Sequence, residues 1–259
     1  MVPRMAGRIQ SIERAAAILR LLAGGARGLS LAEISRTVEL PKGTVLGLLR
    51  TLQHVGFVEQ DSETGHYQLG GGVLRLGTRY LDGNELRTRA LNWADSLAAR
   101  SGESVRIGTL HEAQVLVVHH VFRPDDTRQT LDVGSLLPLH ATALGKTLMA
   151  FDPLAAPLDL AEDDLKSFTN HTITEVSALL DELEEIRHQG WAAEMEELVE
   201  GEVAIAAPIR DRRGMTVGAI GLSGAVERLC NGDGLIMEQV SYVRDAARSI
   251  SRDLGAHPW

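Results

Sequence analysis

Apolar residues recur at helical spacing three times near the start of the chain, and a short alternating segment follows them. The first helix is predicted over Ser11–Leu22, with its first serine as the cap and Gly24–Gly25 as its end. The second opens on a capping box, Ser30–Glu33, and runs to about Leu40. The third covers Lys42–Gln53. Three short helices in this order are typical of a helix-turn-helix core.

A hairpin is predicted directly after the third helix. Residues alternate over Phe57–Asp61 and again over His66–Leu69, and the turn between them contains Gly65. Such a hairpin is a wing, so we expect a winged helix-turn-helix domain over residues 8–70. The same order of elements also serves protein contacts. A small three-helix core in a protein-interaction module without DNA binding is therefore the alternative.

The face of the third helix that lies off its apolar stripe is small, polar and cationic, which suits entry into the major groove of DNA. The candidates for contact with base edges or nearby phosphate are Lys42, Thr44, Leu46, Gly47 and Arg50. Further candidates for contacts with the DNA backbone are Arg8, Ser30, Thr51 and His66.

The remaining chain alternates between helical and extended patterns. A connecting helix is predicted within residues 71–83, and a second domain over residues 84–254. In that domain we predict helices at about Glu85–Arg100, Thr142–Ala150, Glu175–Gln189 and Gly234–Leu254, and strands at Ser104–Leu110, Val115–Val121, Thr130–Val133, Val203–Arg210 and Thr216–Ser223. Clustered hairpins with helices before, between and after them indicate an α+β sheet domain covered by helices.

Charge is divided unevenly along the chain. Residues 1–75 hold nine Lys and Arg against six Asp and Glu, a net charge of +3, while the rest of the chain carries −12. A basic segment in an acidic protein is the expected footprint of phosphate contact, although this excess is small.

Composition limits the cellular setting. No apolar run is long enough to cross a bilayer, and the first residues lack the apolar region of a signal peptide. The single cysteine, Cys230, excludes a disulfide within the chain and fits a reducing compartment. We expect a cytoplasmic protein.

Two features of the sequence invite an enzyme interpretation, a P-loop-like segment and a set of histidines. The segment His140–Thr147 differs from a phosphate-binding P-loop at its first glycine, which His140 replaces, so the backbone curl that binds phosphate is disfavoured. The start of the following helix, with His140 or Lys146, still offers a place for an anionic effector. His111, His119, His120 and His140 lack metal-ligand spacing. We expect neither catalysis nor a metal or other cofactor.

Several motifs, taken in order, resemble the IclR family of bacterial transcriptional regulators. They are the N-terminal segment 8–77, the segment Leu137–Lys146, and the segment Gly190–Glu197 continued by Gly201 and Ala204–Ile209. The resemblance covers about residues 8–254. It implies a GAF-like effector-binding domain, a small organic effector, and homodimers or tetramers that bind an inverted repeat in double-stranded DNA.

The pocket positions that the resemblance implies are Ala143, Leu144, Glu194, Ala204, Gly221 and Ser223. Many members carry Asp or Ser at the position of Glu194, often Cys at that of Ala204, and several a hydroxyl at that of Gly221. The effector of this chain is therefore expected to differ from the small keto acids.

Within the family, three segments are most similar to the regulators of glycerol operons in actinomycetes: Arg50–Gln53, Val118–Asp126 and Gly224–Arg228. That similarity implies a repressor of carbon catabolism whose effector is glycerol or glycerol 3-phosphate. Glu194 and Ser223 would suit an uncharged polyol. A phosphate ester would need His140, Lys146 or Arg128 to approach the pocket.

Overall fold

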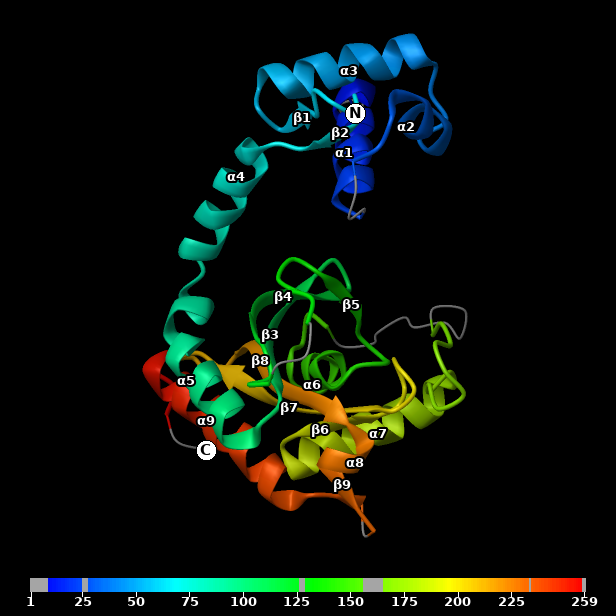
Figure 1. The fold of residues 1–259 in the computed structure, drawn as a ribbon. Helices are drawn as coiled ribbons and strands as arrows, with labels where there is room; N and C mark the ends of the chain where they lie inside the picture. The colour runs from blue at the N-terminus through cyan, green and yellow to red at the C-terminus, as the bar shows by residue number, and fades with distance from the viewer. Residues whose placement is uncertain (1–8, 25–27, 126–128, 156–164, 233, 258–259) are drawn as a thin grey trace, which may run out of the picture. The chain divides into compact units, whose positions relative to one another are not determined.

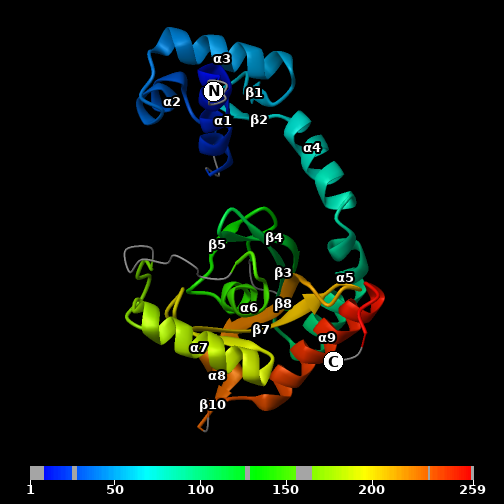
Figure 2. The same cartoon turned by 180° about the vertical axis from the view of Figure 1, so that it is seen from behind.

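The computed structural model of the protein describes residues 9–24, 28–125, 129–155, 165–232 and 234–257. The chain divides into two compact units, Met1–Gly83 and Asn84–Trp259. The α+β fold class is confirmed, with a winged helix-turn-helix in the first unit and a helix-covered sheet in the second (Figures 1 and 2).

The first unit contains helices α1 (Gln10–Ala23), α2 (Leu31–Thr37) and α3 (Lys42–His54), then the wing strands β1 (Val58–Gln60) and β2 (Tyr67–Leu69). One small apolar core holds them together because each helix buries its apolar stripe. The fully buried side chains of that core are Ile18, Ile34, Val45 and Leu49.

Two predicted helix ends in this unit were wrong. Helix α1 is preceded by Ile9 at the cap position, so Ser11 lies inside the helix and no side chain caps it. Helix α2 ends at Thr37 instead of near Leu40. Glu39 adopts a left-handed backbone conformation there, and the Leu40 N–H donates back to the Ser35 carbonyl at 3.1 Å. The capping box of Ser30 and Glu33 was predicted correctly.

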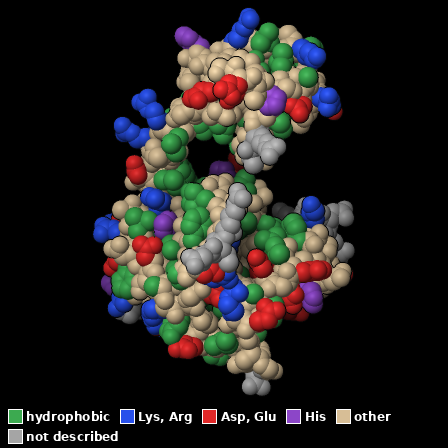
Figure 3. Space-filling model, in the orientation of Figure 1, with side chains coloured by type: hydrophobic (Ala, Val, Ile, Leu, Met, Phe, Trp, Pro, Cys, Tyr) green, Lys and Arg blue, Asp and Glu red, His purple; other side chains and the backbone are tan. Residues whose placement is uncertain are grey.

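Helix α4 (Gly71–Asp82) begins inside the glycine run that follows the wing. A Cβ at Gly72 would lie 2.6 Å from the carbonyl oxygen of Gly56, so this close approach requires glycine. None of the residues of α4 is buried, and Leu74 and Tyr80 are 70% and 57% exposed. Figure 3 shows basic and hydrophobic side chains reaching solvent along this helix.

The second unit is built on a six-stranded antiparallel sheet with the order β5-β4-β3-β8-β7-β6. Its strands are β3 (Ser104–His111), β4 (Gln114–Val121), β5 (Leu136–Pro138), β6 (Ala192–Met195), β7 (Glu202–Arg210) and β8 (Thr216–Ala225). Strands β3, β8 and β7 lie at the centre, so side chains from distant parts of the sequence meet on neighbouring strands.

Helices cover both faces of this sheet because its central strands bury side chains on alternate sides. Helices α5 (Glu85–Ser101) and α9 (Met237–Asp253) pack on the face that presents Ile107, Ile205 and Ile220. Helix α6 (Ala143–Phe151) packs on the opposite face, against Ala206 and Ala219. Helix α7 (Val176–Gln189) packs on α6 and the start of β6.

Two tryptophans border the core between the sheet and helices α5 and α9. Trp93 and Trp191 are both partly buried against that core. The Trp93 indole N–H donates to Asp253 at 2.7 Å, which ties α5 to the end of α9.

The strand predicted at Thr130–Val133 was wrong, and the edge strand is Leu136–Pro138. Thr130 and Leu131 pair with no strand, and a turn follows at once: the Ser135 N–H donates to the Asp132 carbonyl at 2.9 Å, and Gly134 has a positive φ of 90°. Pro138 lies opposite Gln114 of β4 on the edge strand. Proline has no N–H to donate, and it is tolerated here because only one side of an edge strand is paired.

Short elements near the end of the chain were also missed. After the single-turn helix α8 (Val226–Leu229), the strands β9 (Cys230–Asn231) and β10 (Gly234–Leu235) form a small hairpin. The hairpin uses the residues that were expected to open the last helix, so α9 begins at Met237. Strand β6 was not predicted either, because its four residues are too few to show a clear alternation.

Candidate DNA-binding surface and effector pocket

Helix α3 presents one polar face to solvent. Lys42, Thr44, Gly47 and Arg50 are exposed and Leu46 is half-buried, while Val45, Leu49 and Leu52 face the core. No acidic residue occurs anywhere in α3. An exposed helix with cationic and small residues and no negative charge has the chemistry that a phosphate-lined groove requires.

Of the other candidates for DNA contact, Thr51 lies on α3 itself, whereas Ser30 and His66 lie on other elements. The Ser30 hydroxyl is held by its capping box, donating to Glu33 at 2.6 Å, and the Thr51 hydroxyl donates to the Gly47 carbonyl at 3.1 Å. His66 is half-buried beside the wing turn. Arg8 lies outside the described residues.

The second unit contains a cavity of about 190 Å³ above the central strands. All six positions that the family resemblance implied line it: Ala143, Leu144, Glu194, Ala204, Gly221 and Ser223. They come from α6, β6, β7 and β8 and meet because β7 pairs with both β6 and β8, with Ala204 opposite both Glu194 and Ser223.

Glu194 is one of three acidic residues that line the pocket, and it is only 4% exposed. Its Oε1 accepts hydrogen bonds from the backbone N–H groups of Glu197 at 2.8 Å and Leu198 at 3.0 Å. Burial raises the pKa of Glu194 to about 7, although these two hydrogen bonds oppose the rise. Near neutral pH this side chain can therefore either donate or accept a hydrogen bond from a bound molecule.

Arg106 is the cation of the pocket, and it was missed from the sequence. Its Nη1 donates to the Ser223 hydroxyl at 2.5 Å and its Nε to Asp132 at 2.7 Å. Arg106 lies between the fully buried Val105 and Ile107 on β3, and this charged position between two buried apolar residues was the signal available. The guanidinium is held in place from two sides at the wall of the cavity.

A second, more polar cavity of about 390 Å³ shares that wall. Arg106, Asp132, Glu202 and Ser223 line both cavities. His120 also lines the second cavity, where its Nδ1 accepts from the Asp132 N–H at 3.1 Å and its Nε2 lies 2.8 Å from the Ser104 hydroxyl. Burial, followed by the nearby Arg106, lowers the pKa of His120, so a neutral ring fits this position.

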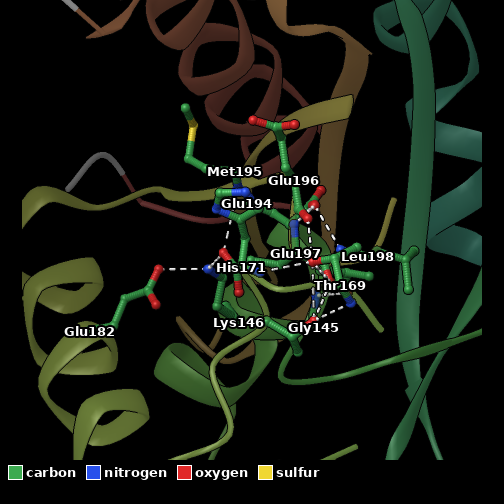
Figure 4. Close-up of polar contacts among 12 residues, drawn as sticks. Gly145, Lys146, Thr169, His171, Glu182, Glu194, Met195, Glu196, Glu197 and Leu198 are labelled. Carbon is green, nitrogen blue, oxygen red and sulfur yellow. Dashed lines mark hydrogen bonds and ion pairs between the residues drawn. The ribbon is translucent and has the colours of Figure 1, made fainter. Parts of the chain in front are cut away.

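Lys146 and His140 do not line the pocket around Glu194, contrary to the expectation that they offer positive charge to an effector. Lys146 is fully buried, and its Nζ donates to Glu182 and Glu197, each at 2.6 Å (Figure 4). His140 is buried, with its Nε2 2.9 Å from the Lys166 carbonyl oxygen. Both side chains are occupied by protein groups. Arg128 lies outside the described residues.

The glycine of the P-loop-like segment His140–Thr147 is explained by packing of the backbone. A Cβ at Gly145 would lie 2.2 Å from the carbonyl oxygen of Leu139, so glycine is required by close packing of the backbone. The Thr142 hydroxyl caps α6 by accepting from the Gly145 N–H at 3.1 Å.

Within the described part of the chain, no three His, Cys, Asp or Glu side chains gather as a metal site would require. No helix among those residues is long and apolar enough to span a membrane.

Two family models match the chain. The IclR helix-turn-helix domain matches residues 11–62, and the C-terminal domain of the bacterial transcriptional regulator IclR matches residues 78–252. The first match includes α1 to α3, and the second includes all residues that line the pocket around Glu194.

Individual proteins agree with these models. A glycerol operon regulatory protein from Streptomyces coelicolor is 58% identical over 252 residues, spanning 97% of this chain and 99% of that protein. The HTH-type transcriptional repressor AllR from Escherichia coli is 34% identical over 254 residues, spanning 96% and 92%. The crystal structure of the Thermotoga maritima IclR superposes with a TM-score of 0.77 at 26% identity, covering 96% of this chain and all of that one.

Sequence motifs, fold and relatives thus agree over nearly the whole chain. The chain belongs to the IclR family, and it is a bacterial transcriptional regulator.

Proposed function

We propose that this regulator represses a glycerol catabolic operon and that a small effector in the second unit changes its affinity for the operator. The observation that carries the proposal is the combination of an exposed helix α3 that contains no acidic residue with a mainly apolar pocket in a separate unit that holds a few polar groups, among them Glu194, Ser223 and Arg106. The names of the relatives support the operon, since the Streptomyces protein is called a glycerol operon regulator and AllR a repressor.

Operator binding is assigned to α3. Lys42, Thr44 and Gly47 would lie along the major groove, and Arg50 would form a bidentate contact with a guanine or a phosphate. Ser30, Thr51 and His66 would then lie near the DNA backbone. A homodimer presents two copies of α3 related by twofold symmetry, which matches an inverted repeat.

The dimer is proposed to form through the uncovered apolar side chains of the first unit. Leu74, Leu76 and Tyr80 on α4 and Ile12 on α1 are each more than half exposed, and exposed apolar surface of this kind commonly marks a protein contact. A regulator of this kind acts where bacterial DNA is, in the cytoplasm. A tetramer would need a further contact.

The effector pocket favours a small polyol or its phosphate ester. A volume of about 190 Å³ accommodates only a small molecule. Glu194 and Ser223 would bind hydroxyl groups, and Arg106 offers the positive charge that His140 and Lys146, outside this pocket, do not supply. Glycerol needs only the first two residues. Glycerol 3-phosphate would also draw Arg106 away from Asp132, because both anions compete for one guanidinium.

Fluorescence anisotropy on DNA from the upstream region of the gene tests this proposal, at two salt concentrations, with and without glycerol and glycerol 3-phosphate. We expect tight, salt-sensitive and sequence-selective binding that one of the two compounds alters. Selective binding that neither compound alters would reject both effectors but keep the regulator. Binding without selectivity or salt dependence would favour a protein-interaction module instead.

A further inference from the structure

A third cavity of the second unit, of about 280 Å³, lies away from the pocket around Glu194 and shares no lining residue with it. It forms where β7 continues past its neighbour. Strand β6 begins at Ala192 opposite Ala206, so Ala207–Arg210 extends beyond that pairing. The end of α7 and the middle of α9 complete the walls of this cavity.

The walls of this cavity carry positive charge and no acidic side chain. Its basic residues are Arg187, His188, Arg210, Arg244 and Arg248, and the remaining lining residues are uncharged. Four guanidinium groups so close together repel one another, and the protein as a whole carries a formal charge of −9. The positive charge of this cavity therefore contrasts with the net negative charge of the whole protein.

In the polar cavity of about 390 Å³, by contrast, arginines lie in ion pairs with acidic residues. There Arg106 is paired with Asp132, and Arg228 with Glu103. In the described residues, Arg187, Arg244 and Arg248 form no ion pair. Arg244 and Arg248 are four residues apart on α9, so they point to the same side of that helix. Their charge remains available to a ligand.

Two of the four guanidinium groups are also held in position. The Arg187 Nε donates to the Ala150 carbonyl at 3.0 Å, and its other nitrogens have no partner among the described residues. Arg210 lies over the ring of Phe151, with 5.4 Å between the guanidinium carbon and the ring centre. Groups oriented before binding lose less conformational freedom when a ligand arrives.

We propose that this basic pocket, lined by Arg187, Arg210, Arg244 and Arg248, binds a small phosphorylated anion. The planar fork of a guanidinium matches two oxygens of a phosphoryl group, and several such forks around one cavity suit a ligand with two or more negative charges. The site is separate from the proposed effector pocket and does not depend on the identity of that effector.

Isothermal titration calorimetry of the full chain with inorganic phosphate, diphosphate and citrate tests the proposal. We expect saturable binding of a phosphate probe that is stronger than binding of citrate. Arg244→Gln and Arg248→Gln should each raise the Kd by about tenfold or more, since each removes a charge-assisted bidentate contact. If inorganic phosphate binds as tightly as diphosphate, the free phosphate ion is a sufficient ligand. If diphosphate binds more tightly, the ligand is one with linked phosphoryl groups.

Matched variants separate this site from general charge effects. Arg89→Gln removes the same charge from an exposed position on α5 and should leave the Kd unchanged. Arg75→Gln, at an exposed position on α4, should leave it unchanged as well. An equal loss of phosphate affinity in Arg89→Gln and Arg244→Gln would overturn the proposal. The absence of saturable phosphate binding by the wild-type protein would overturn it as well. A change of oligomeric mass in Arg244→Gln without any phosphate binding would identify a subunit contact instead.

Discussion

The Oε1 atom of Glu197 lies 2.6 Å from the Nζ of Lys146, and the backbone N–H of the same glutamate donates to Glu194 in the effector pocket. One residue thus joins a buried ion pair to the carboxylate that is proposed to contact the effector (Figure 4). The ion pair reaches α7 as well, because Lys146 also donates to Glu182. The rigidity of the segment that carries Glu194 therefore depends on a lysine that does not line the pocket.

Lys146→Met should destabilise the second unit by about 3–5 kcal/mol, because it leaves the buried Glu197 without its cation. Urea denaturation followed by circular dichroism measures the change. Lys166→Met is the control, since the ammonium of Lys166 lies 5.5 Å from the ring centre of Phe168 and has no buried carboxylate partner among the described residues. The double variant Lys146→Met with Glu197→Gln should recover part of the loss. If the free energy of unfolding that the double variant loses equals the sum of the losses of the two single variants, the ion pair is not the cause.

Glu194→Gln should remove a pH dependence of stability between about pH 4.5 and 7. The pKa of Glu194 in the folded protein, about 7, lies above the ordinary glutamate pKa of 4.5, so between these two pH values the folded state holds a proton that the unfolded chain releases. The contribution of Glu194 is therefore fully present below pH 4.5 and is lost as the pH rises through 7. Denaturation at pH 5 and pH 8 should show wild type losing about 2–3 kcal/mol more than Glu194→Gln. If wild type and Glu194→Gln lose the same stability between pH 5 and pH 8, the pKa of the Glu194 carboxyl is not raised.

Gly145→Ala should destabilise the second unit by about 1–3 kcal/mol or more, since the added methyl group meets the backbone of Leu139 and backbone cannot easily yield. Gly232→Ala is the matched control, because a Cβ there meets no atom within 4 Å and the backbone is not left-handed. Thermal unfolding of the three proteins gives the comparison. Equal midpoints for wild type and Gly145→Ala would mean that α6 shifts to accept the methyl group.

Arg50→Ala should weaken operator binding by about 1–3 kcal/mol if the guanidinium makes a bidentate contact with a base. Arg20→Ala removes the same charge from the exposed end of α1 in the same unit and should have a smaller effect. Anisotropy titrations on operator and on unrelated duplex distinguish the two kinds of contact. A loss confined to the operator indicates base recognition, an equal loss on both indicates phosphate contact, and no loss removes Arg50 from the interface.

Local patterns explain why much of the fold was predictable. The burial of Val45, Leu49 and Leu52 follows from their spacing along α3, and the capping box at Ser30 is complete within four residues. The six pocket positions came from resemblance to a family, and all of them line one cavity. No periodicity in this chain would have placed Glu194 opposite Ala204 and Ala204 opposite Ser223.

What was missed depends on long-range contacts. Lys146 looked available for an anion in the sequence, but its two carboxylate partners lie 36 and 51 residues away. Arg106 is bonded to Ser223, 117 residues further along the chain, and to Asp132 in a turn that was expected to be a strand. Side chains of this kind acquire their role only when β3 pairs with β8, which the spacing of residues within one strand does not reveal.

The positions of the tryptophans determine what optical measurements on this regulator report. All three tryptophans of the sequence, Trp93, Trp191 and Trp259, belong to the second unit, and the first two border its core. Fluorescence excited selectively at tryptophan therefore omits the winged helix-turn-helix, whose Tyr67 is not excited under these conditions, whereas the far-ultraviolet helical signal records both units. Transitions that fail to coincide between the two signals would resolve the stability of the DNA-binding unit without any label.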